Sequence, residues 1–274
     1  MSKHLTPVHV RAFRKKVYGH FEQEGRDLPW RKNLNPYRVL VSEIMLQQTQ
    51  VERVIEKYRQ FLAAFPDFGV LARAPLPKLL AVWSGLGYNR RALALRALAQ
   101  KVVHEHRGIL PRDHEKLLAL PGIGKYSAGA VMAFAFNKPV VFIDTNIRRV
   151  FIHEFFQDRG SIHDEELIPL VELTLDAENP RKWYNALMDY GTMLKQKHAN
   201  PNRRSAHYTR QSPFEDSNRQ VRGKILKVLV SEAPLGTSQI VAKTGMDPER
   251  VKKNLVQLTD EGFVIKRGRL FSIE

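Results

Sequence analysis

The chain has 274 residues, 43% of them hydrophobic, which is enough to bury the core of one large domain or of two unequal ones. Lysine and arginine outnumber aspartate and glutamate by 44 to 28, and the formal net charge of +16 indicates a polyanionic partner, nucleic acid before an anionic membrane. A generally basic soluble protein remains the alternative. Cysteine is absent, which excludes disulfides, thiol nucleophiles, zinc-cysteine sites and cysteine-bound iron–sulfur clusters.

Long apolar segments are also missing from the sequence. No apolar run approaches the roughly 18 residues of a membrane span, and the first residues lack the apolar core of a signal peptide. We therefore expect a cytoplasmic protein that is associated with the nucleoid through DNA.

Apolar residues recur at spacings of three and four along the first two thirds of the chain, a pattern typical of helices. It predicts helices at 7–22, 36–64, 76–82, 90–106, 113–119, 145–156, 164–176 and 180–194. The β-branched run from Val140 to Ile143 is too short to separate a strand from a buried loop.

The composition changes after residue 194. Residues 195–220 are polar and basic, which indicates a long connector that either lies on the first domain or moves freely. Beyond it we expect three helices, with Thr237 and Asp247 as N-caps of the second and third, and then two strands around a basic turn. The ranges are 221–231, 237–244 and 247–261 for the helices, 262–265 and 270–273 for the strands, and 266–269 for the turn.

This C-terminal pattern resembles a winged helix-turn-helix, whose third helix can enter the major groove of DNA. A small protein-interaction domain is the alternative. Basic residues on the third helix and the turn favour contact with DNA: Arg250, Lys252, Lys253, Lys266, Arg267 and Arg269.

The most informative segment runs from Leu120 to Val150. Here Gly122-Ile123-Gly124 forms a tight turn between two helices, where glycines permit positive φ angles and a close approach of the backbone. The N–H groups at the next helix start can bind a DNA phosphate without reading its sequence, and Lys125 and Ser127 can add side-chain donors. An ordinary helix–helix turn would look similar.

Several blocks in order resemble a known family. LPGIGKYSAGA and IDTNIRRV resemble the helix-hairpin-helix DNA glycosylase superfamily, and RDLPWR, NPYRVLVSEIMLQQTQV and WSGLGYNRRALAL resemble its adenine DNA glycosylase branch. The resemblance covers roughly residues 8–194. It implies a mainly α fold: a two-lobed glycosylase domain at 1–194, the connector at 195–220 and a winged-helix-like domain at 221–274.

The resemblance implies base-excision repair, in which the N-glycosidic bond of a flipped, mispaired base is hydrolysed. That reaction needs a proton donor for the base and an anion beside the cationic sugar. Glu43, on a largely apolar helix, matches the general acid, and burial would raise its pKa. Asp144 matches the catalytic aspartate, and a helix start would keep it ionised. From local sequence alone, Asp144 could simply cap a helix, and Glu43 could be solvated or paired with an arginine.

Tyr126 occupies the position at which lyase-competent relatives carry a Schiff-base lysine. Because an imine requires an amine, we expect a monofunctional glycosylase with little strand cleavage.

Further residues take their expected roles from the resemblance. Gln48 would fill the space of the flipped base, and Tyr88 would insert between base pairs, although a tyrosine after glycines is more often a packing residue. Trp30 could equally belong to the core. The residues that would line or border the base pocket are Arg26, Leu28, Trp30, Arg31, Val51 and Asn185.

The sequence also departs from the family. The four cysteines that usually follow the segment matching Asp189-Tyr190-Gly191 are missing, so no iron–sulfur cluster or other cofactor is expected, and His198 and His207 are too poorly spaced to suggest a metal. Asn185 replaces a longer base-reading side chain, and Asn89 replaces an aromatic. Residues 221–274 do not resemble the family's C-terminal domain that reads oxidised guanine, so we expect recognition of the partner base to differ.

The expected substrate is therefore adenine opposite guanine or oxidised guanine in double-stranded DNA, and the expected protein is a monomer without membrane contact. A thymine or uracil mismatch glycosylase of the same fold and a non-enzymatic winged-helix DNA-binding protein remain alternatives.

Overall fold

A computed structural model describes residues 5–210 and 213–274, which are mostly helical. The chain forms two compact units, Met1–Glu43 with Pro111–Arg210 and Ile44–Leu110 with Gln211–Glu274. The chain thus leaves the first unit after Glu43 and later returns to it. In the described part of the chain, no helix is long and apolar enough to cross a membrane.

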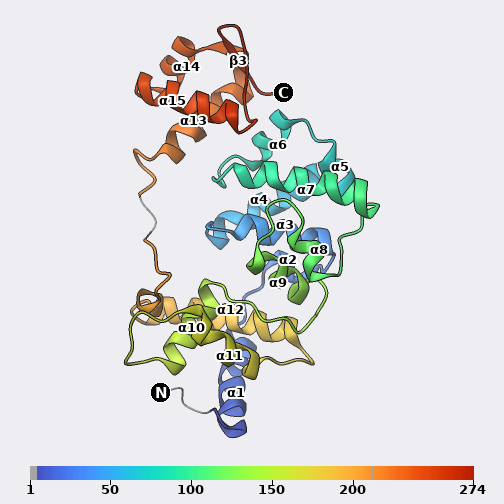
Figure 1. Cartoon of the computed structure of the whole chain (residues 1–274), viewed down its shortest axis with the longest axis vertical. Coiled ribbons are helices and arrows are strands. Elements are labelled where there is room, and N and C mark those ends of the chain that lie inside the picture. The colour runs from blue at the N-terminus through green and yellow to red at the C-terminus, as the bar shows by residue number, and fades with distance from the viewer. Residues whose placement is uncertain (1–4, 211–212) are drawn as a thin grey trace. The chain divides into compact units, whose positions relative to one another are not determined.

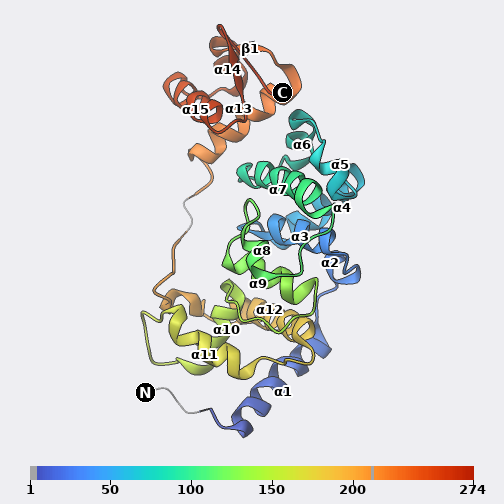
Figure 2. The same cartoon turned by 45° about the vertical axis from the view of Figure 1, so that its right-hand side comes forward.

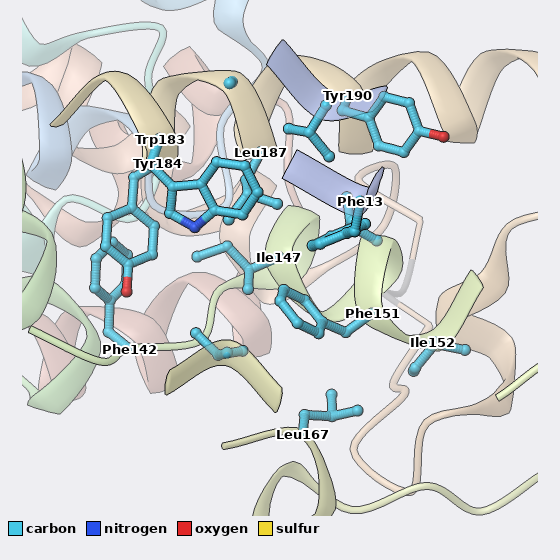
Figure 3. Close-up of a cluster of buried hydrophobic side chains, with 14 of the residues drawn as sticks. Phe13, Phe142, Ile147, Phe151, Ile152, Leu167, Trp183, Tyr184, Leu187 and Tyr190 are labelled. Atoms are coloured by element: carbon cyan, nitrogen blue, oxygen red, sulfur yellow. The ribbon is translucent and has the colours of Figure 1, made fainter. Parts of the chain in front are cut away.

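The first unit is built around the long helices α1 and α12, which pack together with α10 and α11 (Figures 1 and 2). Its core contains aromatic rings in edge-to-face contact: Phe13 lies 5.6 Å from Phe151 and 5.7 Å from Trp183 between ring centroids (Figure 3). Its helices are α1 (Pro7–Glu24), α2 (Pro29–Lys32), α3 (Pro36–Leu46, ending in the second unit), α8 (His114–Leu118), α9 (Lys125–Phe134), α10 (Thr145–Phe155), α11 (Asp164–Thr174), α12 (Pro180–Lys197) and the 3₁₀ helix η1 (Pro201–Arg204).

Two glycines allow helices of this unit to pack unusually closely. A Cβ atom on Gly129 of α9 would lie 2.7 Å from the Cβ atom of Phe142, and one on Gly191 of α12 would lie 2.7 Å from the carbonyl oxygen of Asn146. Neither glycine could carry a side chain without displacing its neighbour.

The second unit combines four helices from the middle of the chain with the C-terminal elements. The C-terminal order of helix, strand, helix, helix, strand, strand is that of a winged helix, as predicted, and β3 lies between antiparallel β1 and β2. Phe271 of β3 pairs with Leu235 on one side and Lys266 on the other. The elements are α4 (Val51–Ala64), α5 (Phe68–Ala72), α6 (Leu76–Trp83), α7 (Arg90–His106), α13 (Asn218–Glu232), β1 (Leu235–Gly236), α14 (Thr237–Thr244), α15 (Pro248–Asp260), β2 (Ile265–Arg267) and β3 (Leu270–Ser272).

Several local predictions need correction. The helix predicted at 36–64 is two helices, because the chain breaks between α3 and α4, where Gln48 has a φ of 55°. Gly236, one residue before Thr237, is the N-cap of α14, whereas Asp247 caps α15 as predicted and accepts the Arg250 N–H at 2.8 Å.

The strands also differ from their predicted ranges. β2 extends over Lys266 and Arg267, which the sequence assigned to the turn, and Val140 to Ile143 form no strand. The missed elements are very short: α2, α5, η1 and β1.

Residues 195–210 of the predicted connector lie on the first unit, which decides between the two predicted states for that part. Residues 213–220 belong to the second unit, where 218–220 open α13. The side-chain amide of Asn202 donates to the Thr145 carbonyl at 2.8 Å, and Arg204 donates to the carbonyls of Phe156 and Gln157. These bonds attach η1 to both ends of α10. Residues 211–212 of the predicted connector lie outside the described residues, and the three-part division at 194 and 220 stays a prediction.

Candidate active site

Asp144 is the N-cap of α10, so the helix-capping role that local sequence suggested is present. Its Oδ1 accepts the Ile147 N–H at 2.6 Å and its Oδ2 accepts the Asn146 side-chain amide at 3.1 Å. The Asn146 oxygen in turn accepts from Arg149 at 2.7 Å, and the same guanidinium nitrogen donates to the Gly191 carbonyl at 2.7 Å. The carboxylate is therefore held by a chain of hydrogen bonds that ends on a buried arginine.

The electrostatics of Asp144 are less simple than its helix position predicts. Burial raises the pKa of its carboxyl, while the hydrogen bonds from Ile147 and Asn146 and the charge of Arg149 lower it. The hydrogen bonds at the helix start lower the pKa of Asp144, as expected. The effect of burial is larger, so the pKa is raised overall. An ionised carboxylate has more acceptor sites than the two hydrogen bonds of the cap use, so the cap and a catalytic role are compatible.

Glu43 lies on α3 and is only 6% exposed, which excludes the solvated alternative. Its Oε2 accepts a hydrogen bond of 3.1 Å from the Tyr126 hydroxyl. Burial raises the pKa of Glu43 to about 7; the Tyr126 hydrogen bond lowers it and the charge of Asp144 raises it further. The raised pKa expected from the sequence is confirmed.

Tyr126 joins the two acids electrostatically. It is the second residue of α9, and its ring packs 5.8 Å from that of Phe142. Burial, followed by the charges of Glu43 and Asp144, raises the pKa of its phenol well above the ordinary value. Tyr126 therefore keeps its proton and acts as a donor to Glu43. The arrangement pairs a carboxyl that holds a proton near neutral pH with a second acid whose ionised form is stabilised by hydrogen bonds.

The hairpin before α9 has the open backbone that phosphate binding requires. Gly122 adopts a φ of 77°, whereas Gly124, the N-cap of α9, has a φ of −100°, so only the first glycine needs left-handed backbone. A Cβ atom on Gly124 would meet nothing within 4 Å. Lys125 is exposed beside the turn. Ser127 is 3% exposed, which argues against the side-chain phosphate contact predicted for it.

Two residues predicted for the base pocket, Arg26 and Arg31, bind one buried acid. The Arg26 Nε and Arg31 Nη1 lie 2.7 and 2.8 Å from the two carboxylate oxygens of Asp189, which is 2% exposed. Burial alone would raise the pKa of Asp189. The charges of Arg31 and Arg26 outweigh burial and hold this pKa below its ordinary value. Asp189 was missed as a site residue, although an acid in an apolar helix is a signal for a buried ion pair.

The other predicted pocket residues are spread over both units. Leu28 and Trp30 are buried, as a core role for Trp30 would require, and Asn185 is partly buried with its carbonyl 3.5 Å from Arg31 Nη2. Val51, the first residue of α4, is partly buried in the second unit.

The two residues predicted to enter DNA, Gln48 and Tyr88, lie on loops of the second unit with left-handed backbone. Their φ angles are 55° and 48°, values that side-chain-bearing residues rarely adopt. One guanidinium group joins the loops: Arg91 donates to the carbonyls of Ile44, Met45 and Gln47 at 2.8, 2.9 and 2.6 Å and to those of Leu86 and Gly87 at 3.2 and 3.1 Å.

Arg91 was not singled out from the sequence. Burial lowers its pKa to about 10, which leaves it charged at neutral pH. The Tyr88 ring lies 5.5 Å from the Arg91 guanidinium and 5.5 Å from that of Arg219 of α13, and Arg219 donates to the Tyr88 hydroxyl at 2.9 Å. The available signal was a pair of arginines after Gly-Leu-Gly-Tyr-Asn, in a helix that otherwise begins with apolar residues.

Comparisons with known proteins agree with this geometry. Residues 41–168 match the HhH-GPD superfamily of base excision DNA repair proteins. An adenine DNA glycosylase of Mycolicibacterium smegmatis is 33% identical over 89% of this chain and 89% of its own length. The chain belongs to the adenine DNA glycosylase family. The resemblance predicted from the sequence is thereby confirmed.

Other members of the family are longer. The adenine DNA glycosylase of Buchnera aphidicola from Baizongia pistaciae is 38% identical over 65% of this chain and 50% of its own length, and the human one is 37% identical over 68% and 36%. The chain thus spans half the length of the first and about a third of the second.

Solved structures share the fold. A thermostable thymine-DNA glycosylase matches with a TM-score of 0.62 and 26% identity, over 70% of this chain and 90% of its own. A trapped covalent intermediate of endonuclease III with DNA matches with a TM-score of 0.55 and 21% identity, over 79% and 94%, and supports the fold alone.

Proposed function

We propose that the protein is a monofunctional DNA glycosylase that removes adenine mispaired with guanine or oxidised guanine from double-stranded DNA. The observation that carries the proposal is the acid pair: the buried Glu43, whose pKa is about 7, accepts a hydrogen bond from Tyr126, and the charge of Asp144 raises its pKa. Membership of the adenine DNA glycosylase family supplies the substrate class.

The reaction begins when the target nucleotide leaves the base stack. Glu43, directly or through a water molecule, gives its proton to a ring nitrogen of the purine, so the base departs as a neutral molecule when the C–N bond breaks. A carboxyl with a pKa of about 7 is suited to this step, since it holds the proton near neutral pH and releases it readily.

Asp144 stabilises the positive charge that develops on the sugar. The Asn146–Arg149 chain fixes its position before the reaction, so little reorganisation is needed when the oxocarbenium ion forms. Family resemblance also admits a transient covalent bond between the aspartate and the sugar. Attack by water leaves an abasic site in either case.

The monofunctional assignment depends on Tyr126. A Schiff base needs an amine, whereas the residue at this position is a phenol. The phenol stays protonated and donates a hydrogen bond to Glu43. The neighbouring Lys125 is exposed, whereas Tyr126 packs toward Phe142. We therefore infer that strand cleavage is not part of the reaction.

DNA binding uses the other predicted residues. We assign the hairpin at Gly122, Gly124 and Lys125 to backbone phosphate. We assign Gln48 to the space left by the flipped base, and Tyr88 to insertion between base pairs. The protein acts as a monomer, since each of these groups is supplied by the same chain.

A second candidate is a thymine or uracil mismatch glycosylase. It is favoured by the structural likeness to a thymine-DNA glycosylase and by the short side chain of Asn185 at a base-reading position. Glu43 argues for the purine, because protonation of a ring nitrogen assists a purine leaving group most directly. A winged-helix protein that only binds DNA would not need the acid pair.

One assay separates these functions. Duplexes carrying A opposite G or oxidised G, T opposite G, or U opposite G are incubated with the protein, and released bases are identified by mass spectrometry. We expect free adenine, release by Asp144→Asn that is about 10³-fold slower, and no borohydride-trapped adduct. Release of thymine or uracil without adenine would select the second candidate, and release of no base would contradict both.

A further inference from the structure

The start of α11 and the end of the described connector bring together side chains that are typical metal ligands. His163, Glu165 and His207 each offer one ligand atom, and these atoms all lie within 4.8 Å of one another. The two imidazole rings are nearly perpendicular, with an interplanar angle of 87° and centroids 5.7 Å apart. The three residues take no part in the acid pair or the DNA-binding loops.

Backbone pairing brings the two histidines together although they are 44 positions apart in the sequence. The Ile162 N–H donates to the Arg204 carbonyl at 2.9 Å, and the Ala206 N–H donates to the Ile162 carbonyl at 2.9 Å. Ile162 and Ser205 form a parallel bridge and are both buried. His163 directly follows Ile162, and His207 directly follows Ala206, so the fold fixes the backbones of both before any ligand binds.

The neighbouring acids distinguish Glu165 from an ordinary solvated carboxylate. Asp164 binds Arg148 at 2.6 Å and Glu166 binds Arg159 at 2.8 Å. Among residues 5–210 and 213–274, Glu165 forms no ion pair, and its carboxylate lies with the two imidazoles. Of the three acids at the start of α11, Glu165 alone is left for a cation.

We propose that His163, Glu165 and His207 bind one divalent transition-metal ion of the zinc type, with water completing the coordination. Two imidazoles and one carboxylate are a common zinc ligand set. Ligand atoms about 2.1 Å from a tetrahedral zinc ion lie about 3.4 Å apart, so the observed spacing needs side-chain movements of about 1 Å. All three side chains are exposed, which permits that movement.

The ion would link His207 of the connector to His163 and Glu165 at the start of α11. Between these points, Asn200 accepts from Arg149 at 3.2 Å and Asn202 donates to Thr145 at 2.8 Å, so the connector supports the first turn of α10, which begins after Asp144. The site is structural, and it stabilises the segment that contacts α10, the helix capped by Asp144, without joining the chemistry.

The test uses the full chain, stripped of metal with a chelator and titrated with Zn²⁺ by calorimetry and with Co²⁺ by visible absorption. We expect one ion per chain with a Kd in the range of about 1–10 µM, and a rise of about 5 °C in the unfolding midpoint at 100 times that Kd. His163→Gln and His207→Gln should each weaken binding at least tenfold, whereas His198→Gln, a change in the same connector, should leave it unchanged.

Circular dichroism of each variant without metal verifies that it folds. A Kd above about 100 µM, or binding that survives both substitutions, would overturn the proposal. Because the readout is metal affinity, the outcome does not depend on whether the protein releases adenine.

Discussion

The two units position the residues that we assign to catalysis and DNA binding in different ways. In the first, Glu43 is buried and Asp144 is partly buried. Loss of water raises the pKa of both acids, and hydrogen bonds from Tyr126 to Glu43 and from Asn146 to Asp144 lower it. In the second, Gln48 and Tyr88 lie on loops with left-handed backbone, and a single cation on α7 holds the carbonyls around both.

The difference predicts which property of the protein a substitution in each unit should change. Burial raises the pKa of Glu43, to which we assign the proton transfer, so a substitution there should change the chemical step. Burial of Arg91 serves no proton transfer, because its pKa of about 10 leaves it charged throughout the neutral range. A substitution at Arg91 should change stability and DNA affinity instead.

The largest effect is expected for Asp144→Asn. Asparagine caps a helix nearly as well as aspartate, so the fold should remain while the negative charge is lost. Single-turnover adenine release should fall about 10³-fold with DNA affinity within about threefold of the parent. Asp144→Ala should additionally lower the free energy of unfolding by about 1 kcal/mol. If Asp144→Asn were as active as the parent, Asp144 would serve only as a helix cap and not in the reaction.

Arg91→Met tests the second unit. It removes the donors for five carbonyl groups, and we expect the free energy of unfolding to fall by about 3 kcal/mol and DNA affinity by about tenfold. Adenine release at saturating DNA should change less. The matched control is Arg90→Met, since Arg90 is 74% exposed and pairs with Glu261. If both variants lost stability and DNA affinity to a similar extent, the bonds from Arg91 to the loop carbonyls would not be the cause.

The raised pKa of Glu43 predicts a pH dependence of stability. Below the ordinary pKa of 4.5, the carboxyl is protonated in the folded and unfolded states alike. Between pH 4.5 and about 7, the folded protein keeps a proton that the unfolded chain releases, so the free energy of unfolding falls as the pH rises, by about 3 kcal/mol in total.

Denaturation with urea at pH 5 and pH 8 measures this loss. Glu43→Gln should remove it, whereas the surface variant Glu22→Gln should retain it. A parent protein and Glu43→Gln with the same pH dependence would mean that Glu43 titrates as an ordinary carboxyl.

The smallest effect is expected for Tyr126→Phe. The Tyr126 hydroxyl lowers the pKa of Glu43, so its removal should move the alkaline limb of the activity profile to higher pH by less than about one pH unit. The packing of the ring on Phe142 should remain. A shift to lower pH would contradict the assigned direction of the hydrogen bond.

Sequence reasoning succeeded where the cause is local. The cap at Asp144, the Asp247-Pro248 helix start and the burial of Glu43 all follow from neighbouring residues. It failed where the cause lies far along the chain. The break between α3 and α4 depends on Arg91, more than forty positions away from the carbonyls that it binds.

The same limit applies to the site. Arg26 and Arg31 were placed by resemblance, but their shared partner Asp189 lies more than 150 positions away. The two-residue strand β1 exists only because it pairs with β3, so its own residues carry no strand pattern. The short connector helix η1 likewise depends on bonds to α10.

The most direct test of the central claim, that Glu43 is the proton donor, is the pH profile of single-turnover adenine release under saturating protein. The account predicts that the rate of the parent falls as the pH rises through about 7, and that Glu43→Gln is at least 10²-fold slower and lacks this fall. A parent rate that stays constant from pH 6 to pH 9, or a Glu43→Gln variant that keeps the parent's profile, would contradict it.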